Sequence, residues 1–135
     1  MGDLTLLGVA VVDVRRSSHV LLAGELDHYS AGPLRAAISS ILAGDRRLRR
    51  IELDAALLSF CDAAGLDALL GAQRQAAARG VTLRLVRTSA PLRRLLKLTG
   101  LTEVLTATGD PDPAPSPFHG PLYGFPPPPA TTEAV

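Results

Sequence analysis

One short segment of the chain carries side chains that could do chemistry. It covers residues 60–66 and reads Phe-Cys-Asp-Ala-Ala-Gly-Leu. A short apolar stretch that predicts a strand, residues 51–53, precedes it, and an amphipathic helical pattern follows at once. The carboxylate of Asp62 therefore falls where a loop becomes a helix N-terminus, a place where backbone N–H groups favour negative charge. A hydroxyl there would be a natural phosphate acceptor, but Ala63 and Ala64 occupy the position.

Three side chains in this segment or directly before it have two interpretations each. Asp62 can cap the helix by accepting a hydrogen bond from a backbone N–H, and it can also contact a partner. Cys61 lies where a helix N-terminus can lower a thiol pKa and favour redox chemistry, although free cysteines are most often buried and inert. Because Cys61 is the only cysteine, an intrachain disulfide is excluded. Ser59 is an alternative phosphate acceptor, or else a capping or turn residue.

Other chemistries lack support in the sequence. There is no Gly-rich phosphate loop, no Gly-x-Ser-x-Gly and no His pair with metal-ligand spacing, so we expect neither an enzyme nor a bound metal or cofactor. A basic cluster at residues 46–50 is interrupted by acidic neighbours and has no aromatic side chains, which favours a solvated patch over a nucleic-acid surface.

The surrounding pattern predicts the elements that position this segment. Strands are expected at residues 9–14 and 19–26, 51–53 and 81–85, with a possible last strand at 104–105. Helices are expected from about Ser30 or Gly32 to Gly44, over residues 63–79, and from Pro91 to Gly100. This alternation predicts a single α/β domain, residues 1–108, in which helices cover a mixed sheet.

The bulk composition fits one ordinary globular domain. The chain has 135 residues, of which 47% are hydrophobic and 4% aromatic, and a formal net charge of +1. That charge predicts no particular attraction to nucleic acid or membranes. No stretch approaches the roughly 18 apolar residues of a membrane span, and the N-terminus lacks a signal-peptide pattern. We therefore expect a cytoplasmic protein without membrane insertion; the sequence is silent on its oligomeric state.

The C-terminal end has a different character. Nine of the eleven prolines lie between Pro111 and Pro129. This composition predicts a disordered tail, residues 109–135, with local polyproline II conformation. The tail could bind a proline-recognising partner, or it could have no partner.

Taken together, the order of elements and three segments resemble the STAS domain, the fold of bacterial anti-sigma factor antagonists. The first segment is Gly-Glu-Leu-Asp at 24–27. The second joins Ile-Glu-Leu-Asp at 51–54 to the segment at 60–66. The third joins Leu-Arg-Leu-Val at 83–86 to the apolar positions of 91–101. The resemblance spans about residues 5–107.

The resemblance implies a protein-binding regulator whose partner is an anti-sigma factor and serine kinase of the GHKL type. In this family the loop typically reads Asp-Ser-Ser/Thr-Gly, and the partner phosphorylates the hydroxyl residue before the glycine. Here the phosphoacceptor position is Ala64, which cannot be phosphorylated. The implied partner-binding residues are the following: Asp27, Asp62, Ala63, Ala64, Gly65 and Leu66. Two functions stay open, an antagonist without this phosphorylation switch and a scaffold module of a stress-signalling or lipid-transport complex.

Overall fold

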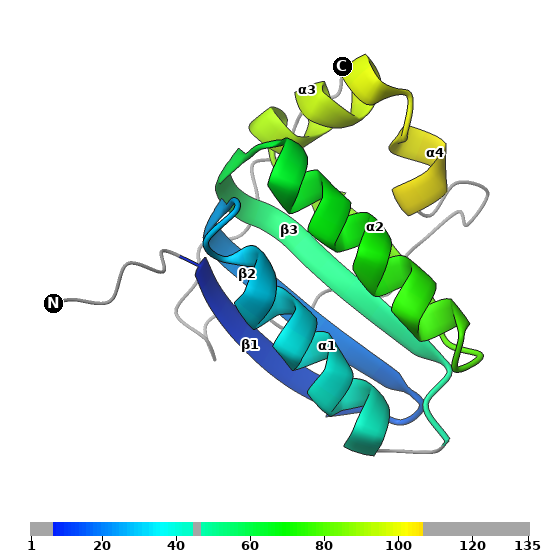
Figure 1. Ribbon diagram of the computed structural model, residues 1–135. Coiled ribbons are helices and arrows are strands. Elements are labelled where there is room, and N and C mark those ends of the chain that lie inside the picture. Colours follow the sequence, from blue (N-terminus) through cyan, green and yellow to red (C-terminus); the bar gives the residue numbers. More distant parts are fainter. Residues whose placement is uncertain (1–6, 45–46, 107–135) are drawn as a thin grey trace, which may run out of the picture.

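The computed structural model describes residues 7–44 and 47–106 of the chain (Figure 1). The predicted tail, residues 109–135, lies outside the described residues. Within the described residues, four strands and four helices follow one another: β1 (Leu7–Val14), β2 (Ser17–Leu26), α1 (Ala31–Gly44), β3 (Arg50–Cys61), α2 (Ala63–Ala77), β4 (Thr82–Thr88), α3 (Ala90–Thr99) and α4 (Thr102–Leu105).

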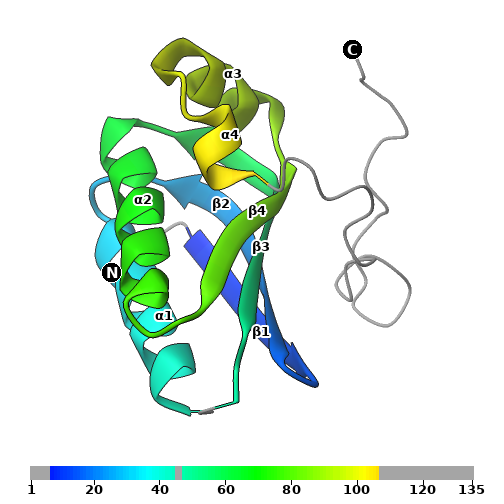
Figure 2. The same cartoon turned by 90° about the vertical axis from the view of Figure 1, so that its right-hand side faces the viewer.

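The strands form one mixed sheet in the order β1-β2-β3-β4. β1 pairs with β2 in antiparallel orientation, and β2, β3 and β4 are parallel neighbours. Helices α1 and α2 lie side by side over one face of the sheet, while α3 and α4 lie at one end (Figure 2). The predicted fold class, a single α/β domain with helices covering a mixed sheet, is confirmed.

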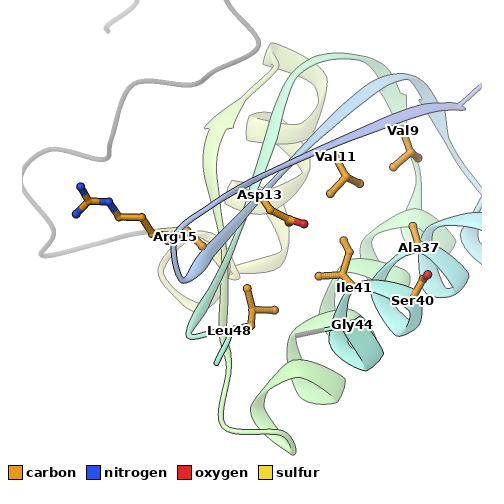
Figure 3. Close-up of a pocket in the computed structure, with 10 residues that line it drawn as sticks. Val9, Val11, Asp13, Arg15, Ala37, Ser40, Ile41, Gly44 and Leu48 are labelled. Atoms are coloured by element: carbon orange, nitrogen blue, oxygen red, sulfur yellow. The ribbon is translucent and has the colours of Figure 1, made fainter. Parts of the chain in front are cut away.

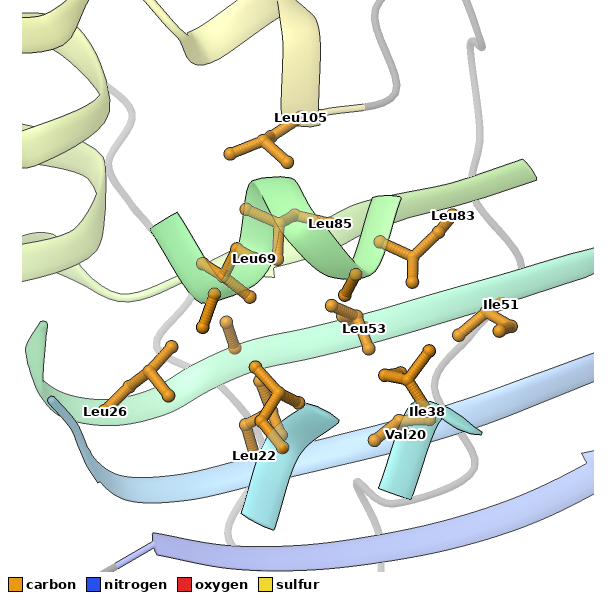
Figure 4. Packing of buried hydrophobic residues seen from close by; sticks show 14 of the residues in the cluster. Val20, Leu22, Leu26, Ile38, Ile51, Leu53, Leu69, Leu83, Leu85 and Leu105 are labelled. Atoms are coloured by element: carbon orange, nitrogen blue, oxygen red, sulfur yellow. The ribbon is translucent and has the colours of Figure 1, made fainter. Parts of the chain in front are cut away.

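A core of aliphatic side chains fills the space between the sheet and the helices (Figure 4). Alternate residues of β2 and β3 point toward the helices, as the two-residue period of a strand requires. Val20, Leu22 and Leu53 come from the sheet, and Ile38 and Leu69 from the two covering helices; all five are fully buried. Burial of each such side chain contributes about 1.5–3 kcal/mol to folding, so the core fixes how the strand ends meet.

Two element predictions need correction. Strand β3 continues to Cys61 instead of ending at residue 53. The sequence pattern did not predict the longer strand because Ala55 and Ala56 have low strand propensity. In addition, the pairing with β4 shifts register after Leu53. The predicted strand at 104–105 belongs to α4, and only the next residue, Thr106, makes a single β-bridge to Leu85.

Candidate functional site

The parallel pairing of β2 and β3 brings two loops to the same end of the sheet. Leu26, the last residue of β2, pairs with Cys61, the last residue of β3. Each strand is followed by a loop that leads into a helix, so the Asp27 loop and Asp62 lie side by side. The carboxyl ends of parallel strands are a common place for binding sites in α/β folds. The structure thus brings together the two acidic residues that the sequence predicted.

Asp62 caps the helix that follows it. Its backbone is extended, with φ −111° and ψ −172°, and its Oδ1 accepts a hydrogen bond from the backbone N–H of Gly65 at 2.9 Å. The Leu66 N–H donates to the Asp62 carbonyl at 2.9 Å, and the Asp62 N–H donates to the Leu26 carbonyl at 3.4 Å. The capping prediction for Asp62 is confirmed, and the last bond also joins the two loops.

Gly65 allows the first turn of α2 to approach the end of β2. A Cβ at this position would lie 2.3 Å from the carbonyl oxygen of Leu26 and 2.9 Å from its Cγ. Such distances do not occur between non-bonded atoms, so only glycine fits without a shift of the backbone. The glycine therefore sets the separation between the helix N-terminus and the Asp27 loop.

Asp27 organises its own loop. Its Oδ1 accepts hydrogen bonds from the backbone N–H groups of Tyr29, at 2.9 Å, and Ser30, at 3.1 Å. The buried Ser30 hydroxyl accepts from the Asp27 N–H and donates to the Glu25 carbonyl, each at 2.8 Å. This arrangement is a turn that leads into α1. Asp27 therefore stabilises the turn before α1, and its partner contact stays a prediction.

Cys61 is less reactive than its place beside a helix N-terminus suggests. Burial, and then the negative charge of Asp62, raise the pKa of the thiol to about 12. Its Sγ lies 3.6 Å from the carbonyl oxygen of Asp62, an acceptor that favours the protonated thiol. A redox role requires a lowered pKa, so the geometry weighs against that hypothesis.

The four residues after Asp62 divide into surface and core. Ala63 is exposed and Ala64 is half-buried, so both can take part in a contact. Gly65 and Leu66 are buried, and Leu66 is 5% exposed within the core cluster. Their contact with a partner stays a prediction; in the structure Gly65 sets the backbone spacing, and Leu66 is buried in the core.

Two exposed aromatic residues at this end were missed by the sequence analysis. Tyr29 is 72% exposed in the Asp27 loop, and Phe60 is 45% exposed near the end of β3. Phe60 pairs with Glu25 of β2, which places it next to the first loop. The available signal was their scarcity, since the chain has only three Phe and two Tyr. Ser59 is also exposed, and its hydroxyl donates to the Gly24 carbonyl at 3.1 Å.

A hollow lies away from these loops, between β1 and the C-terminal half of α1 (Figure 3). It has a volume of about 540 Å³, and its lining includes Val9, Val11, Ile41 and Leu48. Within residues 7–44 and 47–106, no cluster of three or more His, Cys, Asp or Glu side chains could hold a metal ion. No helix of the same residues is long and apolar enough to cross a membrane.

These features define a small α/β domain in which two loops and the start of α2 meet where two parallel strands end. The chain belongs to the STAS domain family: the model of the family described as "Mlab, STAS domain" matches residues 9–106. The anti-sigma-B factor antagonist of Bacillus subtilis (strain 168) is 32% identical to it over 97 residues, which are 70% of this chain and 86% of that protein.

Solved structures agree with this relationship. The unphosphorylated form of the anti-sigma factor antagonist SpoIIAA superposes with a TM-score of 0.62 and 28% identity, over 76% of this chain and 90% of that one. The phosphorylated form of the Bacillus protein gives a TM-score of 0.57 over 76% and 93%, also at 28% identity. An anti-sigma factor antagonist from Mycobacterium paratuberculosis gives 0.64 at 25% identity, over 77% and 88%. These relatives are named as regulatory proteins and not as enzymes.

Proposed function

We propose that this protein is an anti-sigma factor antagonist that acts in the cytoplasm. It binds an anti-sigma factor of the GHKL-kinase type and so releases a sigma factor, without control by phosphorylation at the usual loop position. The observation that carries the proposal is Ala64, a side chain without an oxygen, in the first turn of the helix that Asp62 caps. The Bacillus cell fate determinant SpoIIAA has been solved in a phosphorylated form, whereas Ala64 of this chain has no hydroxyl to accept a phosphate.

The proposed contact surface consists of the Asp27 loop and the start of α2. Tyr29, in the Asp27 loop, and Phe60, near the end of β3, supply exposed aromatic area at the same end of the sheet as Ala63 and Ala64. Aromatic side chains that fill pockets of a partner often dominate the energy of binding. Asp27 and Asp62 each use one carboxylate oxygen in the hydrogen bonds described above, which holds the loops in one conformation before a partner arrives.

The absence of a hydroxyl has a defined electrostatic consequence. A phosphate at position 64 would add about −1.5 to −2 charges next to Asp62 and oppose an interface that needs close contact. Because Ala64 cannot receive it, binding depends only on the concentrations of the partners and on their affinity. The protein is then a competitor that is always able to bind.

Two results test the proposal: which protein binds the chain, and whether one added charge at position 64 weakens that complex. We expect an anti-sigma factor to co-purify with the chain from its own cell. Ala64→Asp, which adds charge and bulk to the proposed interface, should weaken that complex at least about tenfold, or about 1.4 kcal/mol. Calorimetry with the purified partner measures this. Ala43→Asp, an exposed site in the last turn of α1 at the other end of the domain, is the matched control. Equal affinities for the two variants would show that these loops are not the docking surface.

A second candidate function is an interaction module of a stress-signalling or lipid-transport complex. It is favoured by the same missing hydroxyl, because a structural module needs no phosphate switch. The co-purification experiment separates the two functions: subunits of a transport complex, in place of an anti-sigma factor, would favour the module.

A further inference from the structure

The end of the domain opposite the two loops carries five exposed arginine side chains, which we call the basic end. Arg15 and Arg16 form the turn between β1 and β2. Arg49 precedes β3, and Arg50 is its first residue. Arg79 follows α2. These residues come from three separate segments of the chain, so the basic cluster visible in the sequence is only part of the set.

Backbone hydrogen bonds hold two of these segments together. The N–H groups of Arg49 and Arg50 both donate to the carbonyl of Arg16, at 2.8 and 3.2 Å. Arg50 pairs with Ser17 of β2 on one side and with Thr82 of β4 on the other. The turn between β1 and β2 and the start of β3 therefore form one continuous surface.

The third segment reaches the same end of the domain through β4. The loop after Arg79 leads into β4 at Thr82, whose N–H donates to the Arg49 carbonyl at 3.0 Å. The Nη2 of Arg79 donates to the carbonyl of Leu42, near the end of α1, at 3.3 Å. Strands β2, β3 and β4 begin on this side, and α1 and α2 end there (Figure 1). The positive charges thus gather where the parallel strands start.

The arginines of the sheet and those of the basic end differ in their partners. Arg84 and Arg87 each lie within ion-pair distance of a buried carboxylate. Among the described residues, no carboxylate forms an ion pair with any of the five arginines of the basic end. Asp13, which lies close to the turn in the sequence, accepts a hydrogen bond from the Ser18 hydroxyl at 2.8 Å. The five guanidinium groups are therefore available to an anionic ligand.

The backbone of Arg15 is a second observation that favours a use for this surface. Its φ is 57°, in the left-handed region that suits Gly, Asn or Asp. Val14 pairs with Ser17 across the turn, and two-residue turns of this kind usually carry those smaller residues. An arginine in this conformation is strained, and strained residues cluster at functional sites.

The chemistry of the basic end fits an anionic lipid surface better than a nucleic acid. Guanidinium groups bind phosphate oxygens through two parallel hydrogen bonds, and basic side chains near an anionic bilayer are each attracted to it. Val14, beside the turn, is 45% exposed and supplies apolar area that can enter a headgroup layer. The exposed aromatic side chains of the described residues, Tyr29 and Phe60, lie at the other end of the domain. No aromatic ring of the described residues is therefore placed at the basic end to stack on a base.

We propose that the basic end binds the headgroup phosphates of an anionic phospholipid bilayer. The contact is peripheral, with the arginine side chains among the headgroups and the fold outside the hydrocarbon core. The whole-chain charge of +1 does not reveal this attraction, because acidic side chains elsewhere balance the arginines. Asp27 and Asp62 lie at the opposite end and face away from the membrane, so the proposed partner site stays accessible. Membrane contact at the basic end is independent of which protein binds the loops.

Sedimentation of the full chain with lipid vesicles tests this contact. We expect binding to vesicles of phosphatidylcholine mixed with phosphatidylglycerol, and none to phosphatidylcholine alone. Added sodium chloride should weaken the binding, because salt screens exposed charges. Arg49→Gln, Arg50→Gln keeps the backbone bonds of this end and should weaken binding at least about tenfold. Arg94→Gln, Lys97→Gln, which removes two exposed charges from α3, is the matched control and should bind like wild type.

A further variant separates binding from folding. Arg15→Gly removes one charge and also relieves the positive φ of the turn. It should keep or raise stability in urea denaturation while weakening binding to the mixed vesicles about fivefold. Loss of the fold cannot explain such a result.

Three results would overturn the proposal. The first is a failure of the wild-type protein to bind the mixed vesicles at low salt. The second is a wild-type affinity of the Arg15→Gly and Arg49→Gln, Arg50→Gln variants, or an equal loss in the α3 control, which would mean that the basic end does not determine the attraction. The third is tighter binding to a double-stranded DNA oligonucleotide than to the mixed vesicles, which would assign the surface to nucleic acid.

Discussion

Gly65 shows how a single residue can determine the geometry of the candidate site. Because its missing Cβ would meet the backbone of Leu26, Gly65→Ala must push α2 away from the Asp27 loop. We expect the substitution to lower the free energy of unfolding by about 1–3 kcal/mol, as measured by urea denaturation. Gly71→Ala in the same helix meets only the end of the Arg74 side chain at 3.9 Å. That control should raise stability by about 0.5–1 kcal/mol. Equal effects at the two glycines would contradict the close approach.

A second prediction at the scale of single residues concerns how the Cys61 thiol changes stability and reactivity with pH. With a folded pKa of about 12 against an ordinary 9.0, the folded protein keeps the thiol proton where the unfolded chain releases it. The stabilising contribution is therefore complete below about pH 9 and is lost as the pH rises toward 12. At pH 8 the folded protein should react with iodoacetamide at least about tenfold more slowly than the urea-unfolded chain. Equal rates would instead revive the redox hypothesis for Cys61.

At the scale of elements, the start of α2 depends on its cap. Asp62→Ala removes the acceptor for the Gly65 N–H and should cost about 0.5–2 kcal/mol of stability. Asp62→Asn keeps an oxygen in the same place, so it should cost much less. Chemical denaturation of the two variants measures the difference. If both variants lose the same stability, the charge of the carboxylate, and not its hydrogen bond, is what stabilises the helix.

The elements also show which parts of the structure could be predicted from the sequence and which could not. The α2 boundary was predictable because Asp62 and the apolar period that follows it are local signals. The length of β3 was not, because its second half is held by pairing with β2, a contact between distant segments. The same limit applies to the site: the cap at Asp62 was visible, but only the packing shows that Leu66 is buried and that Tyr29 and Phe60 are exposed.

At the scale of the whole molecule, the two surfaces are built from different parts of one sheet. The strand ends carry the proposed partner site, and the helix-free face, opposite α1 and α2, carries a row of close charged contacts among His19, Glu52 and Arg84. At the proposed partner site Ala64 has no hydroxyl that could accept a phosphate, which leads to a direct test.

Restoring the hydroxyl should restore the switch. In the presence of its anti-sigma partner and ATP, the wild-type protein should take up no phosphate over residues 60–66, and its affinity should not change. Ala64→Ser should become phosphorylated and then lose affinity at least about tenfold, since the phosphate adds about −1.5 to −2 charges at the interface. Mass spectrometry locates the phosphate, and calorimetry gives the affinity. Ala63→Ser, one residue earlier and exposed, is the control and should behave as wild type. Phosphate on Ser59 of the wild-type chain, with loss of binding, would contradict an antagonist that cannot be switched off, because that hydroxyl lies on the same surface.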